Sequence, residues 1–330
     1  MRRGGAPSGA ASAPSRVTAL GDRTGVLAGA GAYALWGVFP LFFVLLQPAG
    51  PIEVLAHRVV WSLAVCAVVV TLLRGWPVLL RVLRNPAQLA LLAVAAVVIA
   101  VNWGVYIYAV HIGHVLEASL GYFINPLVTV LFGVLLLGER LRPWQWAAVG
   151  TGAVAVVVLT VAHGRLPWIA LVLAFSFAVY GLVKNRVGRR GGGVDALSSL
   201  SVETMLLFLP AAVTLAVLGA SGQATFTGHG AGHGALLAAT GLVTAVPLLL
   251  FAVAARRVPL TTIGLLQYGA PVLQFVCGLL LGETMPAARW AGFGLVWVAL
   301  VVLTVDTVRG SRQGRGMSQA AVRPVEPVVE

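Results

Sequence analysis

The sequence predicts an all-α polytopic membrane protein with ten transmembrane helices. Its mean hydropathy is +0.95. Only 10% of its 330 residues are charged, whereas soluble domains carry about 25% charged residues. The apolar residues occur in long blocks, and a helix needs about 20 such residues to cross the hydrocarbon layer. No block alternates apolar and polar residues with a period of two, which excludes membrane-spanning strands.

Ten apolar blocks define the expected helices, in chain order. They cover residues 25–47, 53–73, 88–110, 115–137, 144–162, 166–184, 197–218, 235–255, 260–281 and 287–308. Residues 1–24 form a cytoplasmic tail whose Gly, Ala, Ser and Pro content indicates disorder. The Arg2-Arg3 pair lacks the short apolar segment and cleavage site of a signal peptide, so we expect the first block to remain in the mature protein. Residues 309–330 form a second cytoplasmic tail, which we also expect to be disordered.

The basic residues are distributed unevenly between the two sides of the membrane. The formal net charge is +12. With both termini in the cytoplasm, nineteen Lys and Arg residues lie on the inner side, whereas Arg165 and Arg289 alone lie on the outer side. This is the bias that orients membrane helices. The basicity therefore reflects topology, and we expect no nucleic-acid partner.

An internal repeat divides the chain into two halves. Residues 138–160 and 282–304 agree at 11 of 23 ungapped positions, including a Gly-Glu pair and a tryptophan. The halves, residues 25–162 and 163–308, contain five blocks each. Because five is odd, the second half enters the membrane from the opposite side. Inverted repeats of this kind recur in transporters, where the substrate site lies between the halves near mid-membrane.

Polar residues gather on the third and fourth blocks, in "NWGVYIYAVHIGHVLEASLGYFINPL" at 102–127. At 100° per residue, Asn102, Trp103 and Tyr106 share an arc of about 100°. On the fourth block, the polar arc of about 140° contains Glu117, Tyr122 and Asn125. Polar side chains avoid lipid, so both arcs should line a cavity between the two helices. Packing or interfacial anchoring is the alternative for the three aromatic residues.

Ionisable groups within the blocks are rare and costly at mid-membrane. Those considered for a functional role are His57, Arg58, Glu117 and Glu203. Arg58 and Glu117 lie at similar outer depths, so the sequence suggests an ion pair that either handles substrate and protons or joins two helices. Glu203 lies near the inner face with Lys184 as its expected neighbour, in a structural or gating role.

The repeat also predicts mirror residues in the second half. Gln267 and Tyr268 match the region around Tyr122. Pro126 matches Pro271 with one residue of slip, and each should mark broken backbone hydrogen bonding and a kink. These prolines are gating or structural candidates, whereas Gln267 and Tyr268 are candidates for substrate binding.

The sequence contains few features of an enzyme active site. Cys66 and Cys277 lie within apolar blocks, so we expect small packing residues rather than a disulfide or a metal site. No HExxH, GxSxG or Walker A motif occurs, which argues against hydrolysis and ATP drive. We therefore expect no enzymatic activity, metal or cofactor.

Several long motifs resemble one family. "AYALWGVFPLFF" at 32–43, "EVLAHRVVWSL" at 53–63, the segment 102–127 and "PLTTIGLLQYGAPVLQF" at 259–275 are similar to RarD-type members of the EamA-like drug/metabolite transporter superfamily. The resemblance covers roughly residues 25–308. It implies ten helices in two inverted EamA-type halves, the bacterial inner membrane, and secondary transport of small molecules. It supplies no family-wide catalytic residue.

The sequence thus predicts a transporter of a small amphipathic metabolite or drug, with protons as a candidate coupling ion. Membrane lipid is the expected surrounding partner, and Gly25-x-x-x-Gly29 would suit a helix contact in a homodimer. A lipid-modifying enzyme or a sensor subunit is the alternative function. A channel is less favoured, because no ring of like charges lines a candidate pore.

Overall fold

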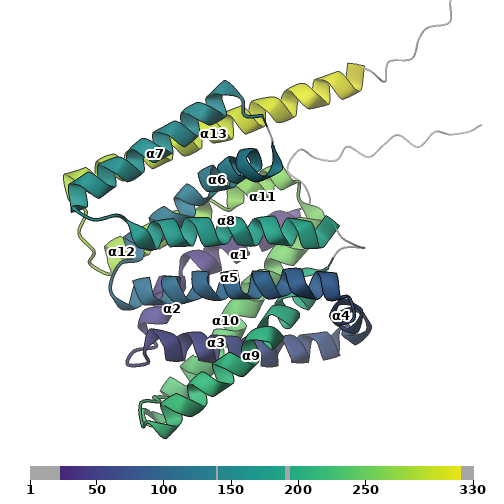
Figure 1. Cartoon of the computed structure of the whole chain (residues 1–330), viewed down its shortest axis with the longest axis vertical. Coiled ribbons are helices and arrows are strands. Elements are labelled where there is room, and N and C mark those ends of the chain that lie inside the picture. The colour runs from purple at the N-terminus through teal and green to yellow at the C-terminus, as the bar shows by residue number, and fades with distance from the viewer. Residues whose placement is uncertain (1–22, 139, 190–193, 321–330) are drawn as a thin grey trace, which may run out of the picture.

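The computed structural model describes residues 23–138, 140–189 and 194–320, and every regular element in them is a helix (Figure 1). Their bounds are α1 (Arg23–Gly37), α2 (Phe39–Val44), α3 (Pro51–Leu72), α4 (Trp76–Leu83), α5 (Pro86–His111), α6 (Val115–Leu137), α7 (Pro143–His163), α8 (Trp168–Arg189), α9 (Ala196–Ala220), α10 (Gly230–Arg257), α11 (Leu260–Leu266), α12 (Gly269–Leu280) and α13 (Ala287–Ala320). The predicted all-α class is confirmed.

Nine stretches of the described chain are long and apolar enough to cross a membrane. They correspond to the second to tenth predicted blocks, with α11 and α12 together forming one stretch. The first block is covered by α1 and α2, which are separated at Val38. The arrangement is consistent with ten crossings, two of them made by broken helices.

The break in the first block follows from Pro40. Proline has no backbone N–H, so the carbonyl of Trp36 loses the donor that an unbroken helix would supply. The side-chain amide of Gln274 on α12 donates to this carbonyl oxygen at 3.1 Å. Cys277 Sγ lies 3.7 Å from the next carbonyl oxygen, that of Gly37. The break in one half is thereby stabilised by a helix of the other half.

The two prolines predicted to mark kinks behave differently. Pro271 lies in the first turn of α12, directly after the break between α11 and α12 at Gln267 and Tyr268. Pro126 lies inside α6, which continues as one helix. Because proline has no backbone N–H, the predicted loss of a backbone hydrogen bond holds there, and the kink stays a prediction. Neighbouring helices can satisfy the groups that a membrane proline leaves unpaired. Beside Pro126, Asn125 contacts a neighbouring helix, because its side-chain amide donates to Ala174 O on α8 at 3.0 Å.

Two helical segments were missed by the sequence analysis. The short helix α4 buries Leu79 and Val82 and exposes Arg81; eight residues are too few to form a spanning block. The end of α13 extends to Ala320, so the disorder expected for residues 309–320 is wrong. No proline precedes Pro324 there, and Arg, Gln, Met and Ala favour helix. The tail predictions for residues 1–22 and 321–330 lie outside the described residues.

The helix contacts have an approximate twofold pattern. If α1, α3, α5, α6 and α7 correspond in order to α8, α9, α10, α11 with α12, and α13, the contacts α1–α10 and α5–α8 exchange with one another. The contacts α3–α9, α6–α12 and α7–α13 map onto themselves. Figure 1 shows α7 and α13 side by side at one edge of the bundle, with α3, α9 and α10 toward the opposite edge. This pattern is what two related halves would produce.

The glycine pair of α1 contacts helices of the same chain. A Cβ atom at Gly25 would lie 2.6 Å from Val258 Cγ2, and one at Gly29 would lie 3.0 Å from Leu266 Cδ1. Only glycine allows this approach. The pattern therefore serves packing within the chain, and the predicted homodimer loses its support from this face.

The bundle has two chemically different ends. We call the end that carries Glu53, Glu117 and Glu283 the carboxylate end; it contains the loops after α2, α5, α7, α9 and α12. The opposite end, with α4 and the loops after α6, α8 and α10, is called the arginine end. In Figure 1 the carboxylate end lies to the left and α4 marks the arginine end on the right.

Candidate functional site

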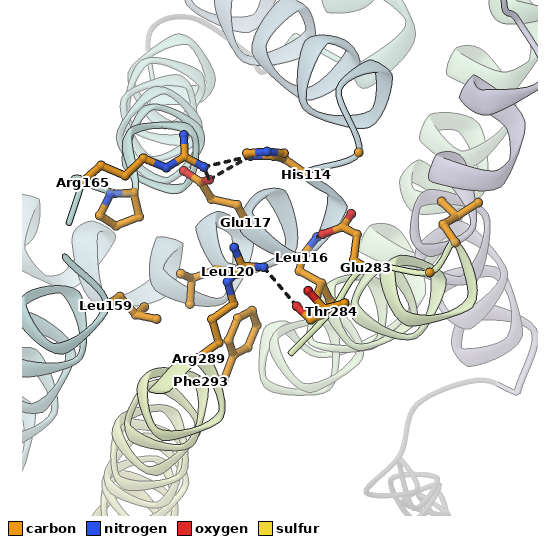
Figure 2. A pocket seen from close by; sticks show the side chains of 14 residues that line it. His114, Leu116, Glu117, Leu120, Leu159, Arg165, Glu283, Thr284, Arg289 and Phe293 are labelled. Carbon is orange, nitrogen blue, oxygen red and sulfur yellow. Dashed lines mark hydrogen bonds and ion pairs between the residues drawn. The ribbon is translucent and has the colours of Figure 1, made fainter. Parts of the chain in front are cut away.

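A cavity of about 400 Å³ opens at the carboxylate end, between the start of α6, the α7–α8 loop and the α12–α13 loop (Figure 2). Its wall brings together both predicted halves. Five of its lining residues are ionisable, namely His114, Glu117, Arg165, Glu283 and Arg289. The cavity therefore contains charges of both signs.

Glu117 links the first half to the start of α8. One carboxylate oxygen accepts a hydrogen bond from Ile169 N at 3.1 Å. The other lies 3.3 Å from His114 Nδ1 and 3.9 Å from Arg165 Nη2. A carboxylate is stabilised at a helix N-terminus by the helix dipole and the unpaired N–H groups.

The Arg58–Glu117 pair that the sequence suggested is wrong. Glu117 lies in the first turn of α6, where the start of α8 and the side chains of His114 and Arg165 surround it. Arg58 bonds Thr244 instead. The sequence indicated that the two side chains lie at a similar depth in the membrane. It did not indicate how each helix is rotated about its axis, because that rotation depends on packing.

Glu283 makes the reciprocal contact from the second half. Its carboxylate accepts hydrogen bonds from Val115 N and from Leu116 N, the latter at 3.1 Å, and so caps α6. Burial raises the pKa of Glu283 above its usual range, and these bonds with the charges of His114 and Arg289 partly offset that effect. In the sequence, Glu283 is recognisable only as part of the Gly-Glu pair that the two halves share. Its place at the opposite half's helix start was not readable from spacing.

Glu53 is a third carboxylate that crosses between the halves. It accepts hydrogen bonds from Thr225 N at 2.6 Å and Thr225 Oγ1 at 3.0 Å, in the α9–α10 loop. The predicted candidate His57 lies beside it, with Nε2 3.9 Å from the carboxylate. The His57 ring stacks on Phe226 at a centroid distance of 4.8 Å. Glu53 was missed because a carboxylate at a helix start resembles an ordinary solvated residue.

Arg58 lies in a cage of aromatic rings in the interior of the bundle. Its guanidinium carbon is 4.0 Å from the ring centroid of Trp103, and 5.6 and 5.7 Å from those of Phe43 and Phe39. Nε donates to Thr244 Oγ1 on α10 at 2.9 Å. The side chain is buried. Cation–π contacts of this kind strengthen when water is excluded.

Asn102, Tyr106 and Tyr122 complete this region. Asn102 is fully buried; its amide nitrogen donates to Leu173 O at 3.1 Å and Ser176 Oγ at 2.9 Å on α8. Its amide oxygen accepts from Tyr122 OH at 3.0 Å. The ring of Tyr106 contacts that of Tyr122 at 5.8 Å. The structure thus joins candidates from α3, α5 and α6, and their role in binding stays a prediction. We call Arg58, Asn102, Trp103, Tyr106 and Tyr122 the central cluster.

The remaining candidates lie in other environments. Gln267 ends α11 and Tyr268 begins the turn to α12; Tyr268 packs against an apolar cluster that includes Phe123 and Phe275. They do not mirror the surroundings of Tyr122. Among the described residues, no group of three His, Cys, Asp or Glu side chains could hold a metal ion.

Lys184 and Glu203 form the ion pair that the sequence predicted, with Nζ 2.8 Å from Oε1. Ser199 Oγ and Tyr180 OH also donate to the Glu203 carboxylate, at 3.0 and 3.1 Å, and Lys184 donates to Ser199 Oγ. All four residues belong to α8 and α9. The pair therefore joins two helices of one half rather than the two halves.

The helical spans and the buried polar groups define a multi-pass membrane protein. The chain belongs to the EamA-like transporter family, whose model matches residues 23–161. It is 58% identical to "Protein RarD" of Streptomyces exfoliatus over 92% of this chain and 95% of that protein. It is 43% identical to an uncharacterized transporter of Pseudomonas aeruginosa, over 88% of this chain and 96% of that one.

Two further comparisons extend these findings. A "Chloramphenicol-sensitive protein RarD" of Pseudomonas aeruginosa is 33% identical, over 86% of this chain and 95% of that protein. A solved crystal structure superposes with a TM-score of 0.55 at 22% identity, covering 87% of this chain and 98% of the other. The structural match supports the fold alone.

Proposed function

We propose that the chain is a secondary transporter of a small amphipathic metabolite or drug in the bacterial inner membrane, working as an exporter or exchanger. Residues 25–162 and 163–308 would act as two inverted halves that expose one site to each side in turn. One observation carries the proposal: the central cluster lies where both halves meet, because Arg58 bonds α10 and Asn102 bonds α8. Sites of this kind lie between repeats in secondary transporters.

The relatives favour transport over the alternative of a lipid-modifying enzyme or a sensor subunit. Three of the matching proteins carry the word transporter in their names, and one is named for chloramphenicol sensitivity. A drug-like amphipathic molecule is compatible with the aromatic and polar side chains of the central cluster. The excess of Lys and Arg at the arginine end favours placing that end and both termini in the cytoplasm.

Alternating access requires the carboxylate end to open and close. A disulfide between α6 and α12 would hold it closed. A Cβ atom at Gly278 would lie 2.8 Å from Leu116 Cδ2, so Leu116→Cys with Gly278→Cys brings two sulfurs together while removing the leucine atoms that would clash. The native cysteines Cys66 and Cys277, both buried, are first replaced by alanine. We call this cysteine-free protein the parent protein.

The test compares solutes released by cells that express the parent protein or the double-cysteine variant, by untargeted mass spectrometry. We expect the parent protein to change the amount of at least one solute outside the cells. The oxidised variant should lose this effect and a reductant should restore it. Transport that continues unchanged through the oxidised variant would contradict alternating access, and an unaltered solute profile with the parent protein would contradict transport.

Coupling to protons is a separate part of the proposal, with Glu117 as its carrier. This carboxylate lines the cavity at the carboxylate end. In proteoliposomes supplied with a solute identified above, Glu117→Gln should abolish transport driven by a pH gradient while leaving the fold intact. If transport in that variant remains coupled to the pH gradient, Glu117 is not the carrier.

A further inference from the structure

Arg58 is a buried cation whose charge is not neutralised by the described protein. Its residue is 4% exposed, and arginine stays protonated in proteins. The ion pairs of the described residues involve other side chains, and no Asp or Glu among them lies within 4.0 Å of the guanidinium. A buried charge without a partner is strongly unfavourable. A protein that retains one has a use for it.

The guanidinium also has hydrogen-bonding capacity to spare. Of its five N–H donors, the one on Nε is used by Thr244. The described residues supply no hydrogen-bond acceptor for the Nη atoms. The hydroxyl of Tyr106, a close electrostatic neighbour, is likewise buried without a hydrogen-bond partner in the described chain. Trp103 contacts the guanidinium at 4.0 Å, so several donors converge beside an aromatic surface.

The arginines that line the cavity at the carboxylate end differ from Arg58, because they have acidic neighbours. At the carboxylate end, Arg165 and Arg289 share the cavity with Glu117 and Glu283. Arg165 lies 3.9 Å from Glu117, and the positive charge of Arg289 acts on Glu283. Those cations already face protein carboxylates. Arg58, by contrast, is buried without a carboxylate partner and has the capacity to attract an external anion.

We infer that Arg58 binds the anionic head of the transported molecule, and that this molecule is an organic monocarboxylate with an apolar or aromatic body. One positive charge is balanced by one negative charge, and the planar fork of arginine matches a carboxylate with two parallel hydrogen bonds. Trp103, Phe39 and Phe43 supply flat apolar surfaces for the body of the molecule. The inference rests on the proposed transport function, since a carried solute is what would reach this interior site.

Matched probes test the charge requirement in purified protein. Benzoate, benzamide and benzamidine share a ring and a planar head group but carry a negative, zero or positive charge. The pair 2-naphthoate and 2-naphthamide repeats the comparison with a larger body. Each is added at several concentrations while the midpoint of thermal unfolding is measured, since binding to the native state raises it.

We expect a carboxylate to bind at least about tenfold more tightly than its amide, and benzamidine to give no protection. Arg58→Gln should abolish the preference. Arg58→Lys keeps the charge without the fork, so it should retain the order of affinities with binding about tenfold weaker. Arg81→Gln, which removes an exposed arginine from α4, should behave as the wild type.

The ligand-free proteins give a second readout. If Arg58 awaits a substrate, Arg58→Met should melt at the same temperature as the wild type or higher, because it replaces an unpaired buried charge with an apolar chain of similar length. A large fall in the midpoint would identify a structural cation and overturn the inference. Carboxylates that protect wild type no more than amides, or protect Arg58→Gln equally, would also overturn it. These measurements need no transport, so they separate this inference from the transport proposal.

Discussion

The two ends of the bundle are closed by different kinds of contact. At the carboxylate end, Glu53, Glu117 and Glu283 each accept hydrogen bonds from backbone N–H groups of the opposite half. At the arginine end, within the described chain, the ion pair of Lys184 stays inside the second half, and Arg142 reaches Asp306 across the halves at 3.7 Å. The first end depends on directional bonds to backbone groups of the opposite half, whereas the contact of Arg142 with Asp306 at the second end is a long ion pair with an exposed cation.

This difference indicates which end is specified as closed in the structure. A carboxylate bound to a helix start requires a fixed position of both halves, because the N–H groups point along the helix axis. A small displacement breaks these bonds together. A distant or exposed ion pair tolerates such a displacement. The carboxylate end should therefore behave as a two-state closure, and the arginine end as a looser one.

The largest expected effect is on stability, and it tests whether the Lys184–Glu203 pair contributes to closing the arginine end. Lys184→Met leaves the Glu203 carboxylate, 1% exposed, without its cation. Removing one partner of a fully buried pair costs about 3–5 kcal/mol of unfolding free energy, and because the Lys184 side chain is 28% exposed we expect a loss near the lower end of this range. Denaturation in mixed micelles measures it. Because both residues lie in one half, maleimide labelling of cysteines placed at either end should not change.

The control for this prediction is Lys184→Met with Glu203→Gln, which removes the unpaired charge and should recover part of the stability. A change in labelling at the arginine end, with stability preserved, would instead assign the pair to gating. The sequence left both roles open. The structure favours the structural one.

The next effect concerns Glu283. Replacing it with alanine removes the acceptor of two backbone hydrogen bonds at the start of α6, and a hydrogen bond to a charged group contributes about 1.5–3 kcal/mol. We expect the carboxylate end to open more often, so that a cysteine at Leu120, which lines the cavity and is buried, reacts with maleimide at least about tenfold faster. Labelling kinetics in the background without native cysteines give the measurement.

A matched carboxylate exists for comparison. Asp195 caps α9 within its own half, accepting from Ser198 N at 3.0 Å. Asp195→Ala should leave the reactivity of the cysteine at position 120 unchanged. Equal acceleration in both variants would mean that general loosening, rather than a contact between halves, controls this end.

Acidity should favour closure of the carboxylate end by a few-fold. Burial raises the pKa of Glu283 in the closed form, whereas an opened carboxyl in water has its ordinary value. The closed form therefore binds the proton more tightly. Closure is strongest below the ordinary pKa and weakens as pH rises through the raised one. Labelling at position 120, corrected for thiol ionisation with unfolded protein, should accelerate as pH rises.

Other charges near Glu283 are those of His114, Glu117, Arg165 and Arg289. Glu283→Gln separates its contribution from theirs, because that variant should lose the part of the pH dependence that belongs to this carboxyl. Identical pH profiles in the two proteins would contradict the role given to Glu283.

The sequence predicted the spans well because crossing a bilayer requires about 20 apolar residues in a row. It also predicted the Lys184–Glu203 pair, since charges are rare within spans. It failed where the outcome depends on how helices are rotated: Arg58 and Glu117 share a depth but face different neighbours. The break before Pro40 was not predicted, because the carbonyl group that this proline leaves unpaired accepts its hydrogen bond from Gln274 on another helix.

The missed carboxylates have a related explanation. Glu53 and Glu283 lie at helix starts or in loops, where an acidic residue is ordinarily solvated. The hydrogen bonds that they accept come from a helix or loop of the other half, more than 160 residues away in sequence. No local pattern records such a partner. The internal repeat singled out Gly282-Glu283, but the sequence does not show which groups this glutamate contacts.

The smallest expected effect is at Arg142, a cation at the arginine end that contacts the opposite half. Its side chain is 53% exposed and lies 3.7 Å from Asp306. Exposed ion pairs contribute about 0.2–1 kcal/mol. Arg142→Gln should therefore lower the unfolding free energy by less than about 1 kcal/mol. It should also leave the labelling rate at position 120 unchanged. A tenfold change in that rate, as expected for Glu283→Ala, would show that both ends are closed equally firmly and would remove the asymmetry on which the two-state closure rests.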